Sequence, residues 1–229
     1  MPQASGLQFT ATIGEYSSDH FSVVGFALTE RLSELFQGRL DLASTDPSVV
    51  ASKVLEQPVD LVIWQDRAPL RRFTGVVSEF ARGDSGHRRT RYELVFRPPL
   101  WRLALMHNSR IFQNRGTDEI VRTLLEERGV VDTVFDLERR PEEREYCVQH
   151  RESDLAFVER LAAEEGWHYR YQHGSLDGQE PPALVFADHH RDSPRLEAVP
   201  YNGKAGGSTR TPCVFRFAYR ERVRPASVA

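Results

Sequence analysis

The strongest restriction on the fold comes from short segments in which apolar and polar residues alternate. Tyr92, Leu94 and Phe96 occupy every second position of one segment, and the charged residues Arg91, Glu93 and Arg97 occupy positions that alternate with them. Side chains along a β-strand point alternately to the two faces of a sheet, so this spacing predicts a half-buried strand. Residues 73–80 show a similar pattern, and the turn-forming residues 82–87 separate the two segments. Together they predict a β-hairpin.

A third strand is predicted at residues 59–64, which are apolar except for Asp60. Several short strands separated by turns favour a barrel or a sandwich in the first hundred residues.

After Trp101 the apolar residues follow a helical period instead. The spacing predicts a helix over residues 117–128, because the apolar residues share one side. Thr117 is the predicted N-cap and Gly129 the predicted left-handed end.

A second helix is predicted over residues 153–165, with Ser153 as its cap and Gly166 as its end. Flanking strands are expected at 144–150, 167–173 and 182–188. This region is therefore mixed α/β, and the chain as a whole is predicted to be a β-rich α+β protein.

The last part of the chain begins with residues 202–208, whose composition is typical of a flexible connection. An alternating strand is predicted after it, with one face formed by Cys213, Phe215, Phe217 and Tyr219. One strand cannot close a sheet alone. We therefore expect it to pair with earlier strands, with another chain, or with sequence beyond these residues.

Composition excludes several classes of protein. The net charge of −3 gives no overall positive field for nucleic acid or anionic lipid. Lys53 and Lys204 are the only lysines among 30 basic residues, which indicates either coding bias or the enrichment of arginine at interfaces. Cys147 and Cys213 form neither a disulfide framework nor a zinc spacing, so a reducing cytoplasm is expected. We predict no signal peptide and no integral membrane segment.

Histidines are the first candidates for chemistry. The set comprises His150, His168, His173, His189 and His190, with Asp188 adjacent to the last two. In a strand, His168 and His173 face opposite sides, as do His189 and His190, so no metal cluster is predicted. A hydrolase site centred on Asp188, His189 and His190 remains as an alternative hypothesis.

Nucleophile and phosphate motifs are absent from the sequence. Residues 174–178 have the wrong spacing for Gly-x-Ser-x-Gly, and residues 206–210 lack the phosphate-loop lysine. Glu142, Glu143 and Glu145 lie in a run of mixed charge, which is typical of a solvated loop. We predict no catalytic, cofactor-binding or metal-binding residues, no cofactor, and no enzymatic activity.

The tip of the predicted hairpin is the best candidate for nucleic-acid binding. Its basic residues are Arg82, His87, Arg88, Arg89 and Arg91. Clustered cations suit phosphate contacts, but the tip lacks the aromatic residues that stack on single-stranded bases. A nucleic-acid-binding β-barrel that uses Arg88, Arg89 and Arg91 is therefore an alternative, while a solvated tip or a protein contact is favoured.

A family resemblance lies in residues 146–161, which read Tyr-Cys-Val-Gln-His-Arg-Glu-Ser-Asp-Leu-Ala-Phe-Val-Glu-Arg-Leu, and in 164–167, which read Glu-Glu-Gly-Trp. These phrases resemble the VgrG family, the spike proteins of type VI secretion. In that family Val-Gln-Tyr precedes Glu-Ser-Asp, Arg-Leu and Glu-Glu-Gly, and His150 stands here in place of the tyrosine. Further matching phrases lie at residues 35–36, 72–77, 98–101, 109–113 and 184–188.

The resemblance implies an amino-terminal part of a spike protein, similar to the contractile-phage baseplate hub. It predicts a first tube-like β-barrel at residues 1–105 and a mixed α/β domain at 106–200. Residues 201–229 are then a linker and the first strand of an incomplete second barrel.

The implied function is that of a structural hub for protein secretion and virulence, which seats the puncturing spike on the Hcp tube hexamer as part of a homotrimer. Baseplate and effector proteins are the other implied partners, with no role for nucleic acid. The resemblance implies assembly in the cytoplasm and later secretion through the type VI apparatus without a signal peptide. The tail hub of a contractile phage or related injector is the alternative within this class.

Overall fold

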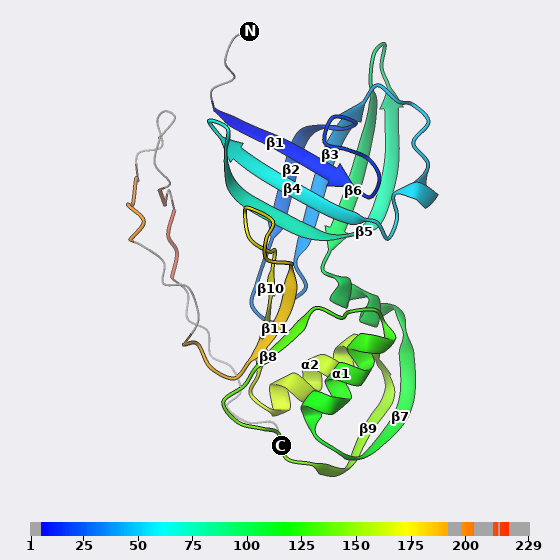
Figure 1. The fold of residues 1–229 in the computed structure, drawn as a ribbon, viewed down its shortest axis with the longest axis vertical. Helices are drawn as coiled ribbons and strands as arrows, with labels where there is room; N and C mark the ends of the chain where they lie inside the picture. The colour runs from blue at the N-terminus through cyan, green and yellow to red at the C-terminus, as the bar shows by residue number, and fades with distance from the viewer. Residues whose placement is uncertain (1–5, 192–197, 204–212, 215, 220–229) are drawn as a thin grey trace. The chain divides into compact units, whose positions relative to one another are not determined.

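The computed structural model describes residues 6–191, 198–203, 213–214 and 216–219 (Figure 1). The chain forms two compact units, residues 1–189 and 190–229. Among the described residues, no helix has the length and apolar character that a membrane crossing requires.

The first part of unit one is a six-stranded antiparallel sheet with the order β1-β4-β5-β6-β3-β2. Its strands are β1 (Leu7–Ile13), β2 (Ser22–Thr29), β3 (Gln37–Ser44), β4 (Pro58–Gln65), β5 (Ala68–Ser85) and β6 (Thr90–Arg97). The sheet is strongly curled into a half-barrel (Figure 1). Its two edge strands approach each other through Phe9 and Phe26, whose ring centroids lie 5.2 Å apart.

Alternation explains the core of this sheet. Tyr92, Leu94 and Phe96 are buried, as predicted, and pack with apolar residues from the other strands. In β4 only every second residue is fully buried, so the apolar segment at 59–64 is a half-buried strand. The predicted hairpin is confirmed, but β5 continues to Ser85 and leaves a shorter turn than the expected 82–87.

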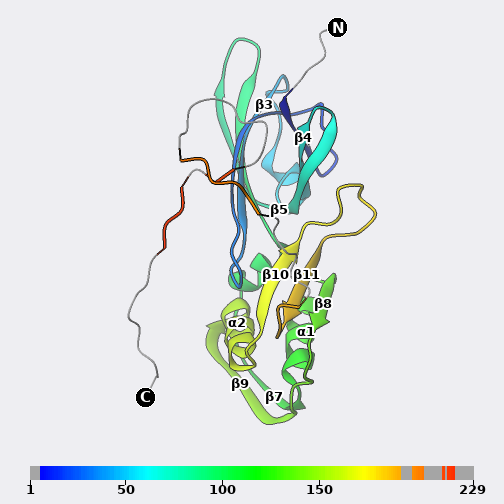
Figure 2. The same ribbon diagram turned by 90° about the vertical axis from the view of Figure 1, so that its left-hand side faces the viewer.

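The remainder of unit one holds two helices between a two-stranded ribbon and a three-stranded sheet (Figures 1 and 2). The ribbon pairs β7 (His107–Arg115) with β9 (Arg144–Ser153), and the helices are α1 (Thr117–Glu127) and α2 (Asp154–Glu164). The small sheet has the order β10-β11-β8 and is formed by β10 (His168–Gln172), β11 (Ala183–Ala187) and β8 (Thr133–Asp136). Short 3-10 helices lie at Ala51–Lys53 and Pro99–Leu105. We call this ribbon, helix and sheet assembly the helical part.

Both predicted helices are present, with one correction at a cap. Ser153 Oγ accepts from the backbone N–H of Ala156, as expected for an N-cap. Gly116, not Thr117, occupies the N-cap position of α1. Thr117 is buried, and its Oγ1 donates to Glu165 Oε1 at 2.6 Å, so a distant carboxylate replaces the local amide as its partner.

The strand predicted in the last part of the chain is not formed in the described residues of the second unit, and this prediction is corrected. In its described residues the ladder is limited to an isolated parallel bridge between Tyr201 and Val214. Phe217 and Tyr219 are largely exposed, and Phe215 lies outside the described residues. The division into parts at residues 105 and 200 stays a prediction.

Candidate functional site

The Gln-x-x-Glu-Ser-Asp phrase builds a buried polar cluster where β9 enters α2. Asp154 is fully buried, and its Oδ1 accepts from Asn108 Nδ2 at 2.7 Å and Gln149 Nε2 at 2.9 Å. Its Oδ2 lies 3.0 Å from Arg128 Nη2 and 3.6 Å from Arg110 Nη2. Buried carboxylates are tolerated when they are paired and hydrogen-bonded in this way.

The electrostatics of Asp154 follow from these contacts. Burial alone raises the pKa of a carboxyl group. Hydrogen bonds from Asn108, Gln149 and Arg128, with the charge of Arg110, outweigh burial and hold the pKa of Asp154 below its ordinary value. The carboxylate is therefore charged and fully engaged, and it has no free position for a substrate or a metal.

The rest of the phrase has structural partners as well. Arg160 Nη2 donates to Glu152 Oε1 at 2.7 Å and to the carbonyl oxygen of Val148 at 3.0 Å, which ties α2 to β9. Gly166 has a φ of 74°, a left-handed conformation that glycine adopts at little cost after a helix. The motif therefore specifies a strand-to-helix junction.

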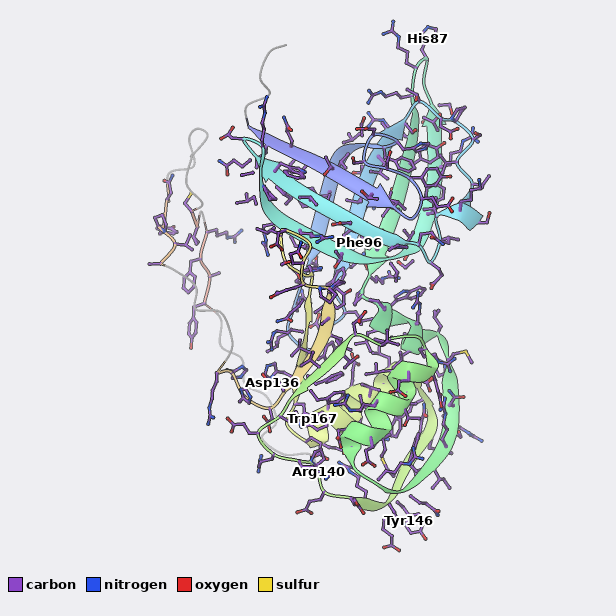
Figure 3. All side chains as sticks on the ribbon, viewed as in Figure 1. His87, Phe96, Asp136, Arg140, Tyr146 and Trp167 are labelled. Carbon is purple, nitrogen blue, oxygen red and sulfur yellow. The ribbon has the colours of Figure 1, made fainter. Side chains whose placement is uncertain are left out.

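Asp188 and His189, two of the residues considered for a hydrolase site, contact neighbouring protein groups. Asp188 accepts from the backbone N–H groups of Glu138 and Arg139 at 2.9 and 3.2 Å. These hydrogen bonds lower the pKa of Asp188 below its ordinary value, and the bond from the Glu138 N–H has the largest effect. His189 Nε2 lies 3.4 Å from Oδ1 of Asp136, which is labelled in Figure 3. Within the described ranges, no three His, Cys, Asp or Glu residues gather as metal ligands would.

The other histidines are dispersed. His168 lies opposite Ala187 in the β10–β11 ladder, and His150 is exposed on β9. His173 is largely buried between the curled sheet and the helical part. The sequence does not predict this buried position of His173, because the position depends on contacts with residues more than 90 positions away.

The acidic residues after Pro141 line an open polar cavity of about 540 Å³. Glu142 and Glu143 lie beside Arg144, which bridges Glu164 and Glu165 at 2.6 and 2.7 Å. These alternating charges match the predicted solvated loop better than a pair of catalytic carboxylates.

The basic hairpin tip extends to the end of unit one, where Figure 3 labels His87. Arg82, Arg88, Arg89 and Arg91 are exposed there, and Arg89 Nη1 donates to Ser22 Oγ at 2.9 Å. The tip presents charge without a flat aromatic platform, as the sequence predicted.

The outward face of the ribbon is the most distinctive surface in unit one. Ile111 lies directly across the ladder from Val148, and Gln113 lies across from Tyr146. Ile111 is 66% exposed, Tyr146 61% and Val148 47%. We call the side chains of Ile111, Gln113, Tyr146 and Val148 the ribbon face. Clustered exposed apolar side chains of this kind mark interaction sites.

The sequence of β9 carries a signal for the ribbon face. In β9, Cys147 and Gln149 are buried, while the alternate residues Tyr146 and Val148 are exposed. The apolar residues thus occur on both faces of the strand. A two-sided apolar strand predicts contact on both faces.

Comparison with known proteins identifies a matching family and several similar proteins. The phage tail baseplate hub (GPD) family matches residues 29–229. The type VI secretion system spike protein VgrG3 of Vibrio cholerae is 37% identical over 224 residues, covering 93% of this chain and 22% of that protein. VgrG2b of Pseudomonas aeruginosa is 39% identical over 222 residues, covering 96% of this chain and 21% of that protein.

A solved structure shares the fold. The E. coli c3393 protein is described as a type VI secretion component with structural similarity to the T4 bacteriophage tail proteins gp27 and gp5. It matches with a TM-score of 0.67 and 25% identity, covering 88% of this chain and 51% of that chain. The chain spans about a fifth of the length of the two spike proteins above. The chain therefore belongs to the phage tail baseplate hub (GPD) family, and over most of its length it is similar to VgrG spike proteins of type VI secretion.

Proposed function

We propose that this chain is the hub part of a type VI spike, which seats the puncturing spike on the Hcp tube hexamer as one third of a homotrimer. The observation that carries the proposal is the match to VgrG3 over 93% of the chain at 37% identity. The half-barrel sheet supports it, because a curved wall can form part of a ring around a tube axis.

The ribbon face supports the same proposal. A ring of subunits needs surfaces that bury apolar side chains against a neighbouring copy. Ile111, Tyr146 and Val148 are available for such a contact. We assign this face to a neighbouring copy of the hub.

Baseplate proteins and effectors are the further partners that we propose. Assembly in the cytoplasm and export through the type VI apparatus complete the proposed path. The alternative is the tail hub of a contractile phage, which is favoured by the phage baseplate description of the matching family.

Light scattering of the full-length spike protein and of the 229-residue chain tests the proposal. We expect a trimer for the full-length protein and a monomer or weak association for the chain alone. Electron microscopy with purified Hcp then tests seating, and the expected result is one trimer at the end of a tube. A monomeric full-length protein, or tubes without end-bound protein, contradicts the proposal.

Binding to nucleic acid distinguishes the alternative class. A phosphate-binding tip predicts an affinity that falls steeply with salt. We expect no binding at about 50 mM salt. Salt-sensitive binding that Arg88→Glu with Arg89→Glu abolishes would favour the nucleic-acid alternative instead.

A further inference from the structure

His173 lies at the joint between the curled sheet and the helical part, directly after β10. The β5–β6 ladder ends where Val76 pairs with Arg97, so Thr74 lies beyond the end of β6. The backbone N–H of Thr74 donates to His173 Nδ1 at 3.0 Å, and Thr74 Oγ1 donates to the His173 carbonyl oxygen at 3.2 Å. His173 therefore covers the strand edge that β6 leaves open.

The other ring nitrogen makes a second connection. His173 Nε2 lies 2.7 Å from Oε1 of Glu30, which belongs to the connection between β2 and β3. This hydrogen bond is the main reason that the pKa of Glu30 lies below its ordinary value, and Arg71 at 4.0 Å adds to the effect. One imidazole thus joins two separate segments of the curled sheet to the helical part.

The contacts define the protonation state of the ring. The Thr74 amide can only donate, so Nδ1 must carry a lone pair toward it, and Nε2–H then donates to the Glu30 carboxylate. The Thr74 carbonyl oxygen is also near Nδ1, at 3.2 Å, but the amide is the closer group. These contacts select the neutral imidazole with its proton on Nε2.

The surroundings hold the ring in place from several sides. Phe36, Phe73 and Tyr171 lie with their ring centroids 4.9 to 5.2 Å from that of His173, whose side chain is 10% exposed. Two residues further on, the carbonyl oxygen of Ser175 accepts from Arg72 Nη1 at 3.1 Å.

An open pocket of about 280 Å³ lies beside the joint, and Glu30, Phe36 and Tyr171 are part of its lining. The Glu30 end of the bridge therefore borders this pocket, and the directional polar contacts add to the aromatic packing around His173.

We propose that His173, as a neutral imidazole bridging Thr74 and Glu30, is the latch that holds the helical part on the curled sheet, and that the joint opens locally when this bridge is lost. This conformational device is independent of the proposed hub function, because it concerns contacts within one chain.

Two substitutions separate the halves of the latch. In His173→Asn, the amide oxygen can replace Nδ1 as acceptor for Thr74 but cannot reach Glu30. In His173→Gln, the amide nitrogen can reach Glu30 but no acceptor remains for Thr74. Because either substitution breaks the bridge between Thr74 and Glu30, we expect hydrogen exchange of the Thr74 amide in the 229-residue chain to be about tenfold faster in both variants than in the unmodified chain. His87→Asn at the exposed hairpin tip is the matched control, with no change expected.

A measurement on the unmodified chain keeps the proposal testable if a variant fails to fold. Nitrogen-15 chemical shifts of His173 at pH 8 should show an unprotonated Nδ1 and a protonated Nε2. A protonated Nδ1 overturns the proposal, as does unchanged exchange of the Thr74 amide in a folded His173→Gln or His173→Asn variant.

Discussion

The curled sheet and the ribbon differ in what their outer faces carry. The sheet buries apolar residues inside and carries ion pairs outside, where Arg39 pairs with Glu93 and Arg97 lies 2.8 Å from Glu79. The ribbon carries apolar residues outside and borders the buried carboxylate of Asp154 inside.

This difference indicates which surface is suited to solvent and which is suited to a partner. Exposed ion pairs satisfy one another in water, and such a face needs no partner. Exposed apolar residues gain free energy when another surface covers them. The outer face of β3, β5 and β6 is therefore suited to solvent, while the ribbon face is suited to a subunit contact.

The largest expected effect tests the inner side of the ribbon. Asp154→Asn leaves Arg128 without its carboxylate partner and removes one of the two carboxylates beside Arg110, which keeps Glu127, so we expect the free energy of unfolding to fall by about 3 kcal/mol. Urea denaturation measures this loss. Asp118→Asn, in the first turn of α1, is the matched control and should cost about 0.5 kcal/mol. Equal losses for the two variants would show that the buried cluster around Asp154 stabilises the fold no more than an exposed carboxylate does.

The pH dependence of stability sharpens the same point. The pKa of Asp154 in the folded chain lies below its ordinary value of 3.8, so its stabilising contribution is complete above that value. The contribution is lost as pH falls below about 4 and through the folded pKa. We expect the unmodified chain to lose more stability than Asp154→Asn between pH 5 and the acid limit. Parallel profiles for the two chains would contradict this assignment.

The outer side of the ribbon is tested by Ile111→Glu in the full-length protein. A charge in an apolar contact should weaken trimer formation by about 2 kcal/mol, or about thirtyfold. Analytical ultracentrifugation across a concentration series measures the change. Ala27→Glu, on an exposed position of β2, introduces the same charge on the curled sheet and should leave the trimer intact. If Ile111→Glu forms normal trimers but blocks secretion, the ribbon face contacts a different protein and our assignment to a neighbouring copy is wrong.

The smallest effect is expected on the outer face of the curled sheet. Glu93→Gln removes the partner of Arg39, but both side chains are substantially exposed. We expect the free energy of unfolding to change by about 0.5 kcal/mol, and the change should shrink at high salt. A loss of 2 kcal/mol or more, measured by urea denaturation, would mean that this face is more than a solvated surface.

Local patterns predicted most of the elements. Alternation identified the β5–β6 hairpin, and Ser153 with Gly166 marked the ends of α2. The pairing of β3 with β6 did not follow from local patterns, because it joins segments about 50 residues apart.

Long-range contacts also explain why the partners of two side chains did not follow from the sequence. Thr117 stands where the local sequence predicts the N-cap of α1, but its hydroxyl group donates to the carboxylate of Glu165, which is 48 residues away in the chain. His173 was predicted to join no metal cluster, and its partners Thr74 and Glu30 come from segments about 100 or more residues away in the chain. In both cases the partner is set by tertiary structure, which the spacing of neighbouring residues does not encode.

Hydroxyl-radical footprinting of Tyr146 tests most directly whether this chain serves as a wall between subunits. The ring is largely exposed in the chain alone, so it should be oxidised readily there. In the full-length trimer we predict that oxidation of Tyr146 is several-fold slower, because a neighbouring copy covers the ribbon face. Equal oxidation rates in the two forms would contradict that prediction.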